Sequence, residues 1–437
     1  MRVAIIGSGI SGMVVAARLH RGHDITVFEA GSHVGGHTNT VDVDWDGRRY
    51  AVDTGFIVFN DWTYPRFIAL LDELGVEYQS SNMSFSLRDE RNGLEYNGTS
   101  VNSLFAQRRN LLRPSFLRMI RDILRFNREA RALLASDDDT LTLGEYLERN
   151  RYSQSFRERY IVPMGMAIWS ATERAMLSFP ARFFVEFFDK HGFLNISNRP
   201  VWQAVKGGSR EYARKLTAPF IERIRLDTPV TSVRRDRAGV TVRTAIGSVE
   251  RFDYVFFACH SDQALRILDG ASEAERAVLG AFPYQKNEAI LHTDQSMLPR
   301  AQRARAAWNC HLMDHGLLDS RHDRERDRVA LTYDMNVLQS LDAPVKFLVT
   351  LNRGADIDPA KVIRKIAYHH PVYLPSGVAA QKRRAEISGR SRTFYCGAYW
   401  RYGFHEDGVV SAEWALEEFE RSLRVDAAAS ALLATAV

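Results

Sequence analysis

The chain of 437 residues has few cysteines and no long apolar run, and each absence narrows the class of protein. The three cysteines, Cys259, Cys310 and Cys396, lie far apart without the spacing of metal ligands, so we interpret them as buried thiols and expect no metal site. The absence of a run of about eighteen apolar residues argues against a transmembrane helix. Met1 leads directly into an apolar strand, which leaves no room for a signal peptide and predicts a cytoplasmic protein.

Charge of one sign is also scarce overall, since the net formal charge is only +5, but arginine is concentrated in one segment. Residues 107–131 carry eight arginines against one aspartate and one glutamate. After Pro114, the apolar residues Phe116, Ile120, Ile123 and Leu124 follow helical spacing opposite a stripe of arginines, which predicts a basic amphipathic helix. Nucleic acid is not expected as a partner, because no recognition module accompanies the arginines.

Two interpretations of this arginine-rich segment stay open. It docks onto anionic phospholipid headgroups at the inner face of the membrane, or it is a solvated face over the protein's own core. The arginines assigned to the membrane contact are Arg108, Arg109, Arg118, Arg121, Arg125 and Arg128.

A glycine motif follows the first predicted strand. The apolar run Val3–Ile6 leads into Gly7, Gly9 and Gly12 at G-x-G-x-x-G spacing, and a helical pattern comes next. These glycines allow a tight turn, a close approach to a pyrophosphate and close packing of helix on strand, respectively. A second short strand ends in Glu29, at the distance where an acid accepts hydrogen bonds from a ribose diol. The pattern predicts a dinucleotide-binding site.

The residues after Glu29 favour FAD over NAD. A second glycine-rich turn, residues 30–38, can close over the diphosphate and flavin end of an extended FAD. Further on, Asp53–Phe56 follows a strand-like segment and can bring a glycine backbone close to the isoalloxazine ring. The residues predicted to contact FAD in these segments are Gly7, Gly9, Ile10, Ser11, Gly12, Glu29, Ala30, Gly35, Gly36, His37, Thr38, Thr54, Gly55 and Phe56.

The strand and turn patterns recur in three separated parts of the chain. We predict an α/β fold whose Rossmann-like FAD-binding domain is assembled from residues 1–79, 208–281 and 391–424. Two insertions, the largely helical 80–207 and the mixed 282–390, would form a substrate or membrane-facing domain. A helix is expected from Val410 to about Leu423, and the alanine-rich tail, residues 425–437, is expected to fray.

This order of elements resembles the flavin amine oxidase and phytoene desaturase superfamily over nearly the whole chain. Longer segments are similar to one subgroup, the flavoproteins found beside, or in plants fused to, cyclopropane fatty acyl phospholipid synthases. These segments are 53–60, 63–65, 82–86, 103–107, 331–339 and 396–408. The subgroup is associated with modification of membrane-lipid acyl chains, including desaturation of methylated chains on the way to furan fatty acids.

The resemblance adds expectations about the cofactor site. It implies an FAD-binding domain of the glutathione reductase-2 type. The FAD is expected to be dissociable, because Cys396 does not stand in the sequence context of covalent flavin attachment. His37 occupies a position where amine oxidases commonly have arginine, and Arg401 is an alternative counter-charge for the diphosphate. The further residues implied to contact FAD are Val230, Gly397, Asp407, Gly408 and Val409.

Candidates for catalysis follow from position in the matched segments. They are His405, Tyr399, Tyr402, Tyr333 and Asn336. His405 could act as a base because its ordinary pKa lies near neutrality, or it could only hydrogen-bond the flavin or the backbone. The aromatic residues Trp169, Phe183, Phe184, Phe187 and Phe188 could line an acyl tunnel or form plain core.

Three functions therefore stand open. The chain could be an FAD-dependent oxidase or desaturase that acts on acyl chains of membrane phospholipids, with molecular oxygen as acceptor. It could instead be an amine oxidase acting on small amines, or a redox-neutral FAD-dependent isomerase. The sequence leaves open whether copies of the chain associate.

Overall fold

A five-stranded parallel sheet joins the beginning of the chain to two much later segments. In the computed structural model, which describes residues 1–135, 138–313 and 330–435, the strand order is β10-β2-β1-β14-β20. The strands are β1 (Arg2–Ile6), β2 (Asp24–Phe28), β10 (Ile224–Arg225), β14 (Tyr254–Phe257) and β20 (Thr393–Tyr395). The predicted Rossmann-like sheet is present, and each of the three segments assigned to it contributes a strand; the domain boundaries themselves stay a prediction.

Alternating apolar side chains bury both faces of this sheet, as a parallel sheet requires. Val3 and Ile5 face a helical layer, whereas Ala4 and Ile6 face a small antiparallel sheet and two helices. The helical layer contains α1 (Ile10–Leu19), α2 (Pro65–Glu73), α10 (Arg210–Thr217) and α15 (His405–Thr435). The opposite layer contains β11 (Val230–Asp236), β12 (Gly239–Thr244), β13 (Val249–Phe252), α11 (Ser261–Ile267) and α12 (Glu273–Leu279).

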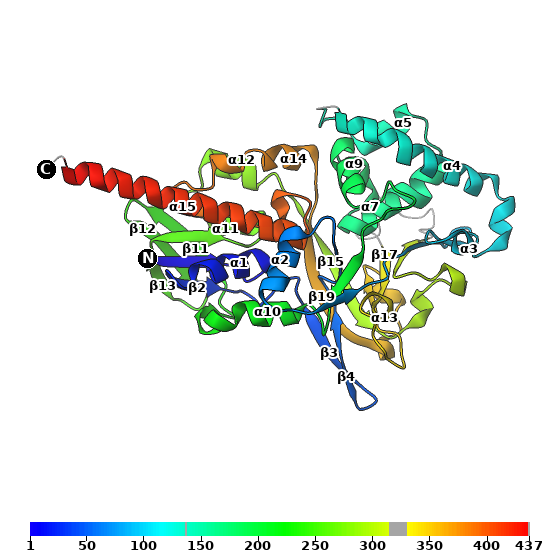
Figure 1. The fold of residues 1–437 in the computed structure, drawn as a ribbon, viewed down its shortest axis with the longest axis horizontal. Coiled ribbons are helices and arrows are strands. Elements are labelled where there is room, and N and C mark those ends of the chain that lie inside the picture. The colour runs from blue at the N-terminus through cyan, green and yellow to red at the C-terminus, as the bar shows by residue number, and fades with distance from the viewer. Residues whose placement is uncertain (136–137, 314–329, 436–437) are drawn as a thin grey trace.

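The C-terminal helix differs from the sequence expectation at both ends. It begins at His405 rather than at Val410, and it continues to Thr435 rather than ending near Leu423. Figure 1 shows α15 running from the centre of the molecule to the end marked C. Glu406, Asp407 and Gly408 therefore lie in its first turn instead of in a loop.

The second large sheet has seven strands and is built from both insertions. Its order is β19-β15-β18-β17-β16-β7-β8, and β16 and β7 form its one parallel pair. The strands are β7 (Phe85–Asp89), β8 (Leu94–Asn97), β15 (Tyr284–His292), β16 (Trp308–Leu312), β17 (Ala330–Asp334), β18 (Leu348–Leu351) and β19 (Val362–Pro371). Smaller elements are β3 (Thr40–Trp45), β4 (Arg48–Asp53), β5 (Phe59–Asn60), β6 (Tyr78–Ser80), β9 (Trp202–Val205), α13 (Met335–Leu338) and α14 (Pro375–Gln381).

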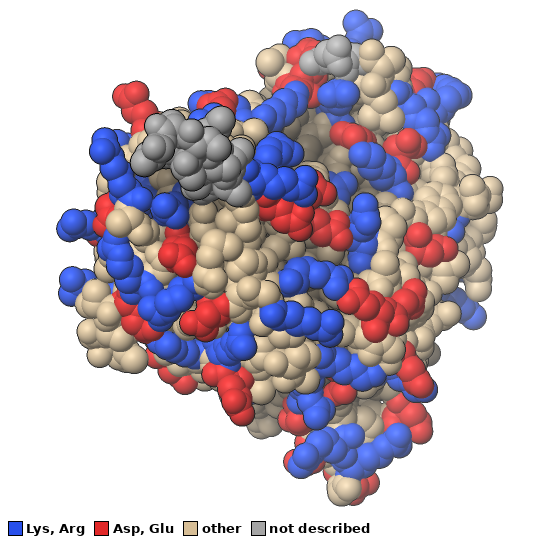
Figure 2. All heavy atoms as spheres, turned by 60° about the vertical axis from the view of Figure 1, so that its left-hand side comes forward, with Lys and Arg blue, Asp and Glu red and all other residues tan. Residues whose placement is uncertain are grey.

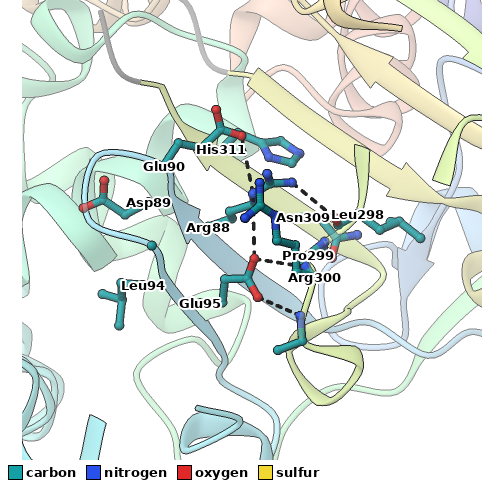
Figure 3. Close-up of polar contacts among 12 residues, drawn as sticks. Arg88, Asp89, Glu90, Leu94, Glu95, Leu298, Pro299, Arg300, Asn309 and His311 are labelled. Atoms are coloured by element: carbon teal, nitrogen blue, oxygen red, sulfur yellow. Dashed lines mark hydrogen bonds and ion pairs between the residues drawn. The ribbon is translucent and has the colours of Figure 1, made fainter. Parts of the chain in front are cut away.

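Ionic contacts fix the β7–β8 edge of this sheet. Figure 3 shows Arg88 between two carboxylates and the backbone of the segment that precedes β16. The Glu95 carboxylate accepts hydrogen bonds from the backbone N–H groups of Arg300 (3.0 Å) and Ala301 (2.8 Å), and it lies 3.7 Å from the Arg88 guanidinium. Because Glu95 is buried, these partners compensate for the loss of its hydration.

A helical region occupies the end of the molecule away from the C-terminus (Figure 1). It contains α3 (Val101–Leu104), α4 (Pro114–Glu129), α5 (Leu143–Arg149), α6 (Gln154–Phe156), α7 (Val162–Trp169), α8 (Glu173–Leu177) and α9 (Ala181–Lys190). Within the described part of the chain, no helix combines the length and apolar composition needed to cross a bilayer.

The predicted basic helix is confirmed as α4, but its buried face is turned relative to the prediction. Phe116, Met119 and Phe126 are buried in the core of the helical region, Ile120 and Ile123 are partly buried, and Leu124 is exposed.

Figure 2, which brings forward the side opposite the helical region, shows Lys and Arg side chains interspersed with Asp and Glu.

Candidate active site

Two glycine turns lie against each other at the carboxyl ends of β1 and β2. Gly9 precedes α1 and forms a bridge to Gly35, whose N–H donates to the carbonyl oxygen of Ser8 (3.1 Å). Gly7 has a φ of +104°, and a Cβ there would lie 2.7 Å from the carbonyl oxygen of Ala258. A Cβ at Gly12 would overlap the carbonyl oxygen of Gly7. The glycines thus let the strand, the helix start and the second turn approach one another around the N-terminus of α1, where anions bind.

Glu29 follows β2 with its carboxylate already held by the chain. Its Oε2 accepts hydrogen bonds from the backbone N–H (2.9 Å) and the hydroxyl (2.6 Å) of Ser8, and its Oε1 accepts from Gly31 N–H (2.8 Å). A carboxylate has about four acceptor sites, so it can still accept from a diol.

A cavity of about 760 Å³ extends from these turns to the seven-stranded sheet. One end is lined by the two glycine turns, Glu29 and Val230. The other end is lined by residues of α7, α9, β17, β18, β19 and the segment 397–405. The volume lies in the range that small-molecule and cofactor sites occupy.

Aromatic side chains form most of the wall at the second end. Trp169 ends α7, and its indole N–H donates to the carbonyl oxygen of Tyr402 (3.1 Å). Phe187 of α9 has its ring centroid 4.7 Å from that of Trp169 and 5.6 Å from that of Tyr402. Phe193 continues the wall after α9. The helical region is thereby joined to the segment before α15 through side chains that line the cavity.

Histidines form another part of the wall. The His37 ring stacks on Tyr368 of β19 at 4.9 Å, and its centroid lies 5.2 Å from that of His370 and 6.4 Å from that of His260. Burial, followed by the neighbouring histidines, lowers the pKa of His37 to about 3, of His370 to about 3 and of His260 to about 4. These rings are therefore neutral at neutral pH.

His405, at the start of α15, also lines the cavity. Its ring stacks on Phe56 with centroids 3.6 Å apart, and its Nε2 lies 3.0 Å from both the Thr38 hydroxyl and the Tyr212 hydroxyl. Thr38 and Tyr212 also contact each other. Burial lowers the pKa of His405 well below its ordinary value, so the ring is neutral.

Comparison with known proteins identifies the family. The model described as flavin containing amine oxidoreductase matches residues 10–296, which is more than half of the chain. The chain belongs to the flavin-containing amine oxidoreductase family. A relative from Mycobacterium tuberculosis, named as the flavin-containing monoamine oxidase AofH, is 27% identical over 260 residues, which cover 57% of this chain and 54% of that protein. The chain spans about half the length of the curated relatives it matches.

Solved structures share the fold over almost the whole chain. Cyclohexylamine oxidase from Brevibacterium oxydans has a TM-score of 0.69 at 17% identity, with 96% of this chain and 99% of that chain covered. A conjugated linoleic acid (CLA)-producing fatty acid isomerase from P. acnes has a TM-score of 0.65 at 16% identity, with 95% and 98% covered. At these identities the likeness establishes the fold, a FAD-binding Rossmann-like domain combined with a mixed substrate domain.

The cofactor of this amine oxidoreductase family is FAD, and the cavity has the features needed to hold it. Gly9 has open space where a Cβ would stand, so a pyrophosphate can reach the first N–H groups of α1. A Cβ at Gly55 would overlap the carbonyl oxygen of His37, so the third predicted segment packs directly on the second glycine turn. Bound there, FAD supplies the hydride-accepting chemistry of the family.

Most of the residues predicted to contact FAD line the cavity. They are Gly7, Gly9, Ile10, Ser11, Glu29, Ala30, Gly35, Gly36, His37, Thr54, Gly55, Phe56, Val230 and Gly397. Gly12, Thr38, Asp407, Gly408 and Val409 do not.

The residues outside the cavity wall have packing or capping roles. Gly408 lets the start of α15 approach α1, because a Cβ there would lie 2.5 Å from Ile10 Cγ2. Asp407 accepts hydrogen bonds from the N–H groups of Tyr402 (3.1 Å) and Phe404 (2.9 Å). Arg401 pairs with Asp407 (3.3 Å) and is absent from the cavity wall, so it is not placed as the counter-charge that the sequence offered as an alternative.

The five catalytic candidates are separated by the structure. Tyr333, Tyr399, Tyr402 and His405 line the cavity, and burial raises the pKa of each of the three tyrosines. The prediction for Asn336 needs correction, because this residue lies outside the cavity wall. Its Oδ1 accepts from Phe347 N–H (2.8 Å) and its Nδ2 donates to the Val345 carbonyl (2.8 Å), so it shapes the turn before β18.

The wall also contains residues that sequence reasoning did not single out. They are His260, His369, His370, Tyr368 and Tyr373. Tyr368 and His370 alternate along β19, so the sequence could have placed these two side chains on one face of a strand. It could not have shown which turn that face contacts, because β19 lies more than 300 residues from His37. Of the aromatic residues in doubt, Trp169 and Phe187 line the cavity, whereas Phe183, Phe184 and Phe188 pack in the core.

The arginines assigned to a membrane contact lie apart from the cavity. Arg108, Arg109, Arg118, Arg121 and Arg128 are exposed. Arg125 differs, because its guanidinium lies 4.0 Å over the Tyr152 ring and donates to the Asn150 carbonyl (3.0 Å). It holds α4 on the helical region rather than facing solvent freely.

Proposed function

We propose that the protein is an FAD-dependent oxidoreductase that introduces a double bond into acyl chains of membrane phospholipids, including methyl-branched chains, with molecular oxygen as electron acceptor. The proposal joins the family membership to the chemistry of the cavity wall. It also follows the resemblance of the longer sequence segments to flavoproteins associated with acyl-chain modification.

The observation that carries the proposal is the scarcity of charge in the wall. In the described part of the chain, Glu29 is the one carboxylate that lines the cavity, and its oxygens are held by Ser8 and Gly31. Arg266 is the one residue of the wall with a permanent positive charge. A cationic amine would lose its hydration here without gaining a carboxylate partner, whereas an acyl chain needs none.

The aromatic wall suits the demands of the reaction. Desaturation removes a hydride from one carbon and a proton from its neighbour, and oxygen then takes two electrons and two protons to become hydrogen peroxide. Trp169, Phe187 and Phe193 can hold an extended apolar chain and exclude water from the reacting carbons. The neutral state of His37, His260 and His370 keeps that part of the wall free of net charge.

The fold alone admits other substrates, since it occurs in cyclohexylamine oxidase as well as in a fatty acid isomerase. The decisive experiment incubates FAD-loaded protein aerobically with phospholipids that carry methylated acyl chains, and analyses the chains by mass spectrometry. We expect the loss of two hydrogen atoms per modified chain and an equal amount of hydrogen peroxide. Flavin reduction by putrescine or cyclohexylamine, with unchanged lipids, would assign an amine oxidase instead; a shifted double bond without peroxide would assign an isomerase.

Two variants at one position test the part played by the wall. Phe193 is partly buried and its ring lies 5.2 Å from that of Phe188. Phe193→Leu keeps an apolar surface and Phe193→Asp adds a carboxylate, and a thermal transition measured for each variant checks that it is folded. We expect Phe193→Leu to keep lipid oxidation and Phe193→Asp to lose most of it at equal FAD content. Equal activity of the two variants would contradict the assignment of this wall to the acyl chain.

A further inference from the structure

Exposed apolar side chains are concentrated in the segment from Val101 to Arg128, which contains α3, η1 (Arg108–Leu112) and α4. Of the fourteen large apolar side chains exposed in the described part of the chain, five lie in these 28 residues. They are Val101, Leu111, Leu112, Leu117 and Leu124. Leu112 is 87% exposed and Val101 is 75% exposed. Single exposed apolar residues are ordinary, whereas several in one short segment call for a physical explanation.

These side chains are not needed by the core beneath them. The inner face of α4 already buries Phe116, Met119 and Phe126, while Leu117 and Leu124 lie on the outer face. Leu111 and Leu112 precede Pro114, which begins α4 and has no N–H to extend η1. The chain therefore presents leucines outward at the start of α4 and along its exposed side.

Arginines surround the leucines with little compensating acid. Arg108, Arg109, Arg118 and Arg121 are exposed, and within the described structure no ion pair is formed by Arg118 or Arg121. Asp122 is buried and accepts a hydrogen bond from Ser153 N–H (3.0 Å). The other acid of α4, Glu129, lies at its C-terminal end, where it pairs with Arg128 (2.8 Å).

We propose that this docking surface, residues Val101–Arg128, binds an anionic phospholipid bilayer, with Leu111 and Leu112 among the acyl chains and with Arg118 and Arg121 at the level of the phosphates. The biological purpose of this contact rests on the proposed function, because the substrate would then lie in the bilayer. Apolar side chains that insert, flanked by arginines that meet phosphate, are the physical signature of interfacial attachment. A soluble protein partner would not require so strong an excess of cations.

The docking surface and the cavity share one packed unit. Phe116 and Phe126 of α4 belong to the same core as Trp169 and Phe187, which line the cavity. Figure 1 shows α4 along the outer edge of the helical region, away from the C-terminal end of α15. A bilayer bound at α4 would therefore hold the helices that form the aromatic wall.

The test measures co-sedimentation of the full-length FAD-loaded protein with vesicles of phosphatidylcholine alone or mixed with phosphatidylglycerol. We expect binding to the mixed vesicles that weakens with salt. Arg118→Glu with Arg121→Glu should weaken it roughly 25-fold or more, because each basic residue near the surface contributes about fivefold in affinity. Leu111→Asp with Leu112→Asp should weaken it at least about tenfold, because inserted leucines lose their burial.

Control variants carry the same types of substitution outside the docking surface, so they show whether the location of the change matters. Ile246→Asp changes a side chain that is 70% exposed between β12 and β13, and Arg214→Glu with Arg424→Glu reverses two exposed charges elsewhere. These controls should bind mixed vesicles like the unaltered protein. Equal loss in the controls, or no binding of the unaltered protein, would overturn the inference. So would a change in sedimentation coefficient of the leucine variant without vesicles, because the surface would then bind a second copy of the chain.

Failure of this inference can be told apart from failure of the proposed function. Vesicle binding is measured without turnover, and lipid oxidation can be measured separately with detergent-dispersed phospholipid. Variant-sensitive binding with unchanged acyl chains would keep the docking surface and remove the desaturase. Oxidation of dispersed lipid, with vesicle binding that ignores the variants, would do the reverse.

Discussion

At Gly12 the presence of one additional carbon decides whether the nucleotide end of the cavity can form. A Cβ there would overlap the carbonyl oxygen of Gly7, and Gly7 in turn lies against Ala258 at the end of β14. The turn, α1 and the neighbouring strand are thus packed backbone to backbone. No side-chain rotation can relieve an added carbon, because its neighbour is a carbonyl group of the same turn.

Gly12→Ala should therefore weaken FAD binding and lower the stability of the fold. Overpacking of this kind costs about 1–3 kcal/mol, and here it displaces the turn that faces the pyrophosphate. We expect the purified variant to lack flavin absorbance while keeping a cooperative thermal transition at lower temperature. Gly22→Ala is the control, because a Cβ at Gly22 meets nothing within 4 Å. Full flavin content in Gly12→Ala would contradict the role given to this glycine.

Site residues that lie close together in the sequence could be predicted, and those far apart could not. The glycines of the two turns and Glu29 all lie within the first 36 residues of the chain, so spacing alone indicates a turn around a dinucleotide. His260 follows β14, which pairs with β1 at the start of the chain, and Tyr368 lies in β19, which pairs with β15. Both residues therefore reach the cavity through strand pairings that the spacing within a motif does not encode. Position in a motif also did not distinguish Tyr333, which lines the cavity, from Asn336, which fixes a turn.

Among the elements, α15 stabilises the start of another helix. The Glu406 carboxylate, in the first turn of α15, accepts hydrogen bonds from the backbone N–H groups of Arg66 (3.1 Å) and Phe67 (2.8 Å). These are among the first N–H groups of α2, which have no partner within their own helix. The residue before α2, Tyr64, offers no side-chain cap, so the partner comes from the far end of the chain.

Glu406→Ala should lower the free energy of unfolding by about 1–2 kcal/mol, the usual loss for a helix cap. Glu406→Gln should lose less, because the amide keeps one acceptor oxygen. Chemical denaturation of the two variants beside Glu417→Ala measures the difference, since Glu417 is exposed on the same helix. A loss in Glu417→Ala as large as in Glu406→Ala would show that the effect belongs to helix composition and not to the cap.

The sequence predicts where helices lie along the chain better than it predicts which side chains of a helix are buried. The apolar periodicity of residues 116–126 indicates a helix, and α4 is one, but the angular position of its buried face depends on neighbours such as Tyr152 and Phe156. The sequence predicts a late start for the C-terminal helix because Gly403 and Gly408 indicate a glycine turn, and an early end because the tail is rich in alanine. In the structure Gly408 lies inside the helix, where close packing against Ile10 explains it.

Across the whole molecule, buried histidines lie in both halves of the structure. His292 and His311 lie in the seven-stranded sheet, His191 follows α9, and His405 begins α15; all are buried. Burial lowers the pKa of His191 and His292 to about 4 and that of His311 to about 3, and it lowers the pKa of His405 well below its ordinary value. Burial acts in the opposite direction on two carboxyls, raising the pKa of Asp53 and of Asp407 to about 6.

These shifts predict a loss of stability in mild acid. Below pH 6.5 the unfolded chain binds protons at the four histidines while the folded protein does not, so the free energy of unfolding falls as the pH falls. Below about pH 6 the two aspartates oppose this, because only the folded protein protonates them there. The cavity histidines His37, His260 and His370 act in the same direction as these four. The histidines therefore outnumber the two aspartates, and the free energy of unfolding should fall between pH 6 and pH 4.

Urea denaturation of the FAD-free protein at pH 7, 6 and 5 measures how the free energy of unfolding changes with pH. A variant of His311, in the interior of the seven-stranded sheet, measures the part due to one histidine. His311→Asn removes a titrating group that hydrogen-bonds Thr332 (3.3 Å), so this variant should start less stable but lose less stability per pH unit. A free energy of unfolding that rises as the pH falls from 7 to 5 would mean that the aspartates outweigh the histidines, and it would contradict this prediction.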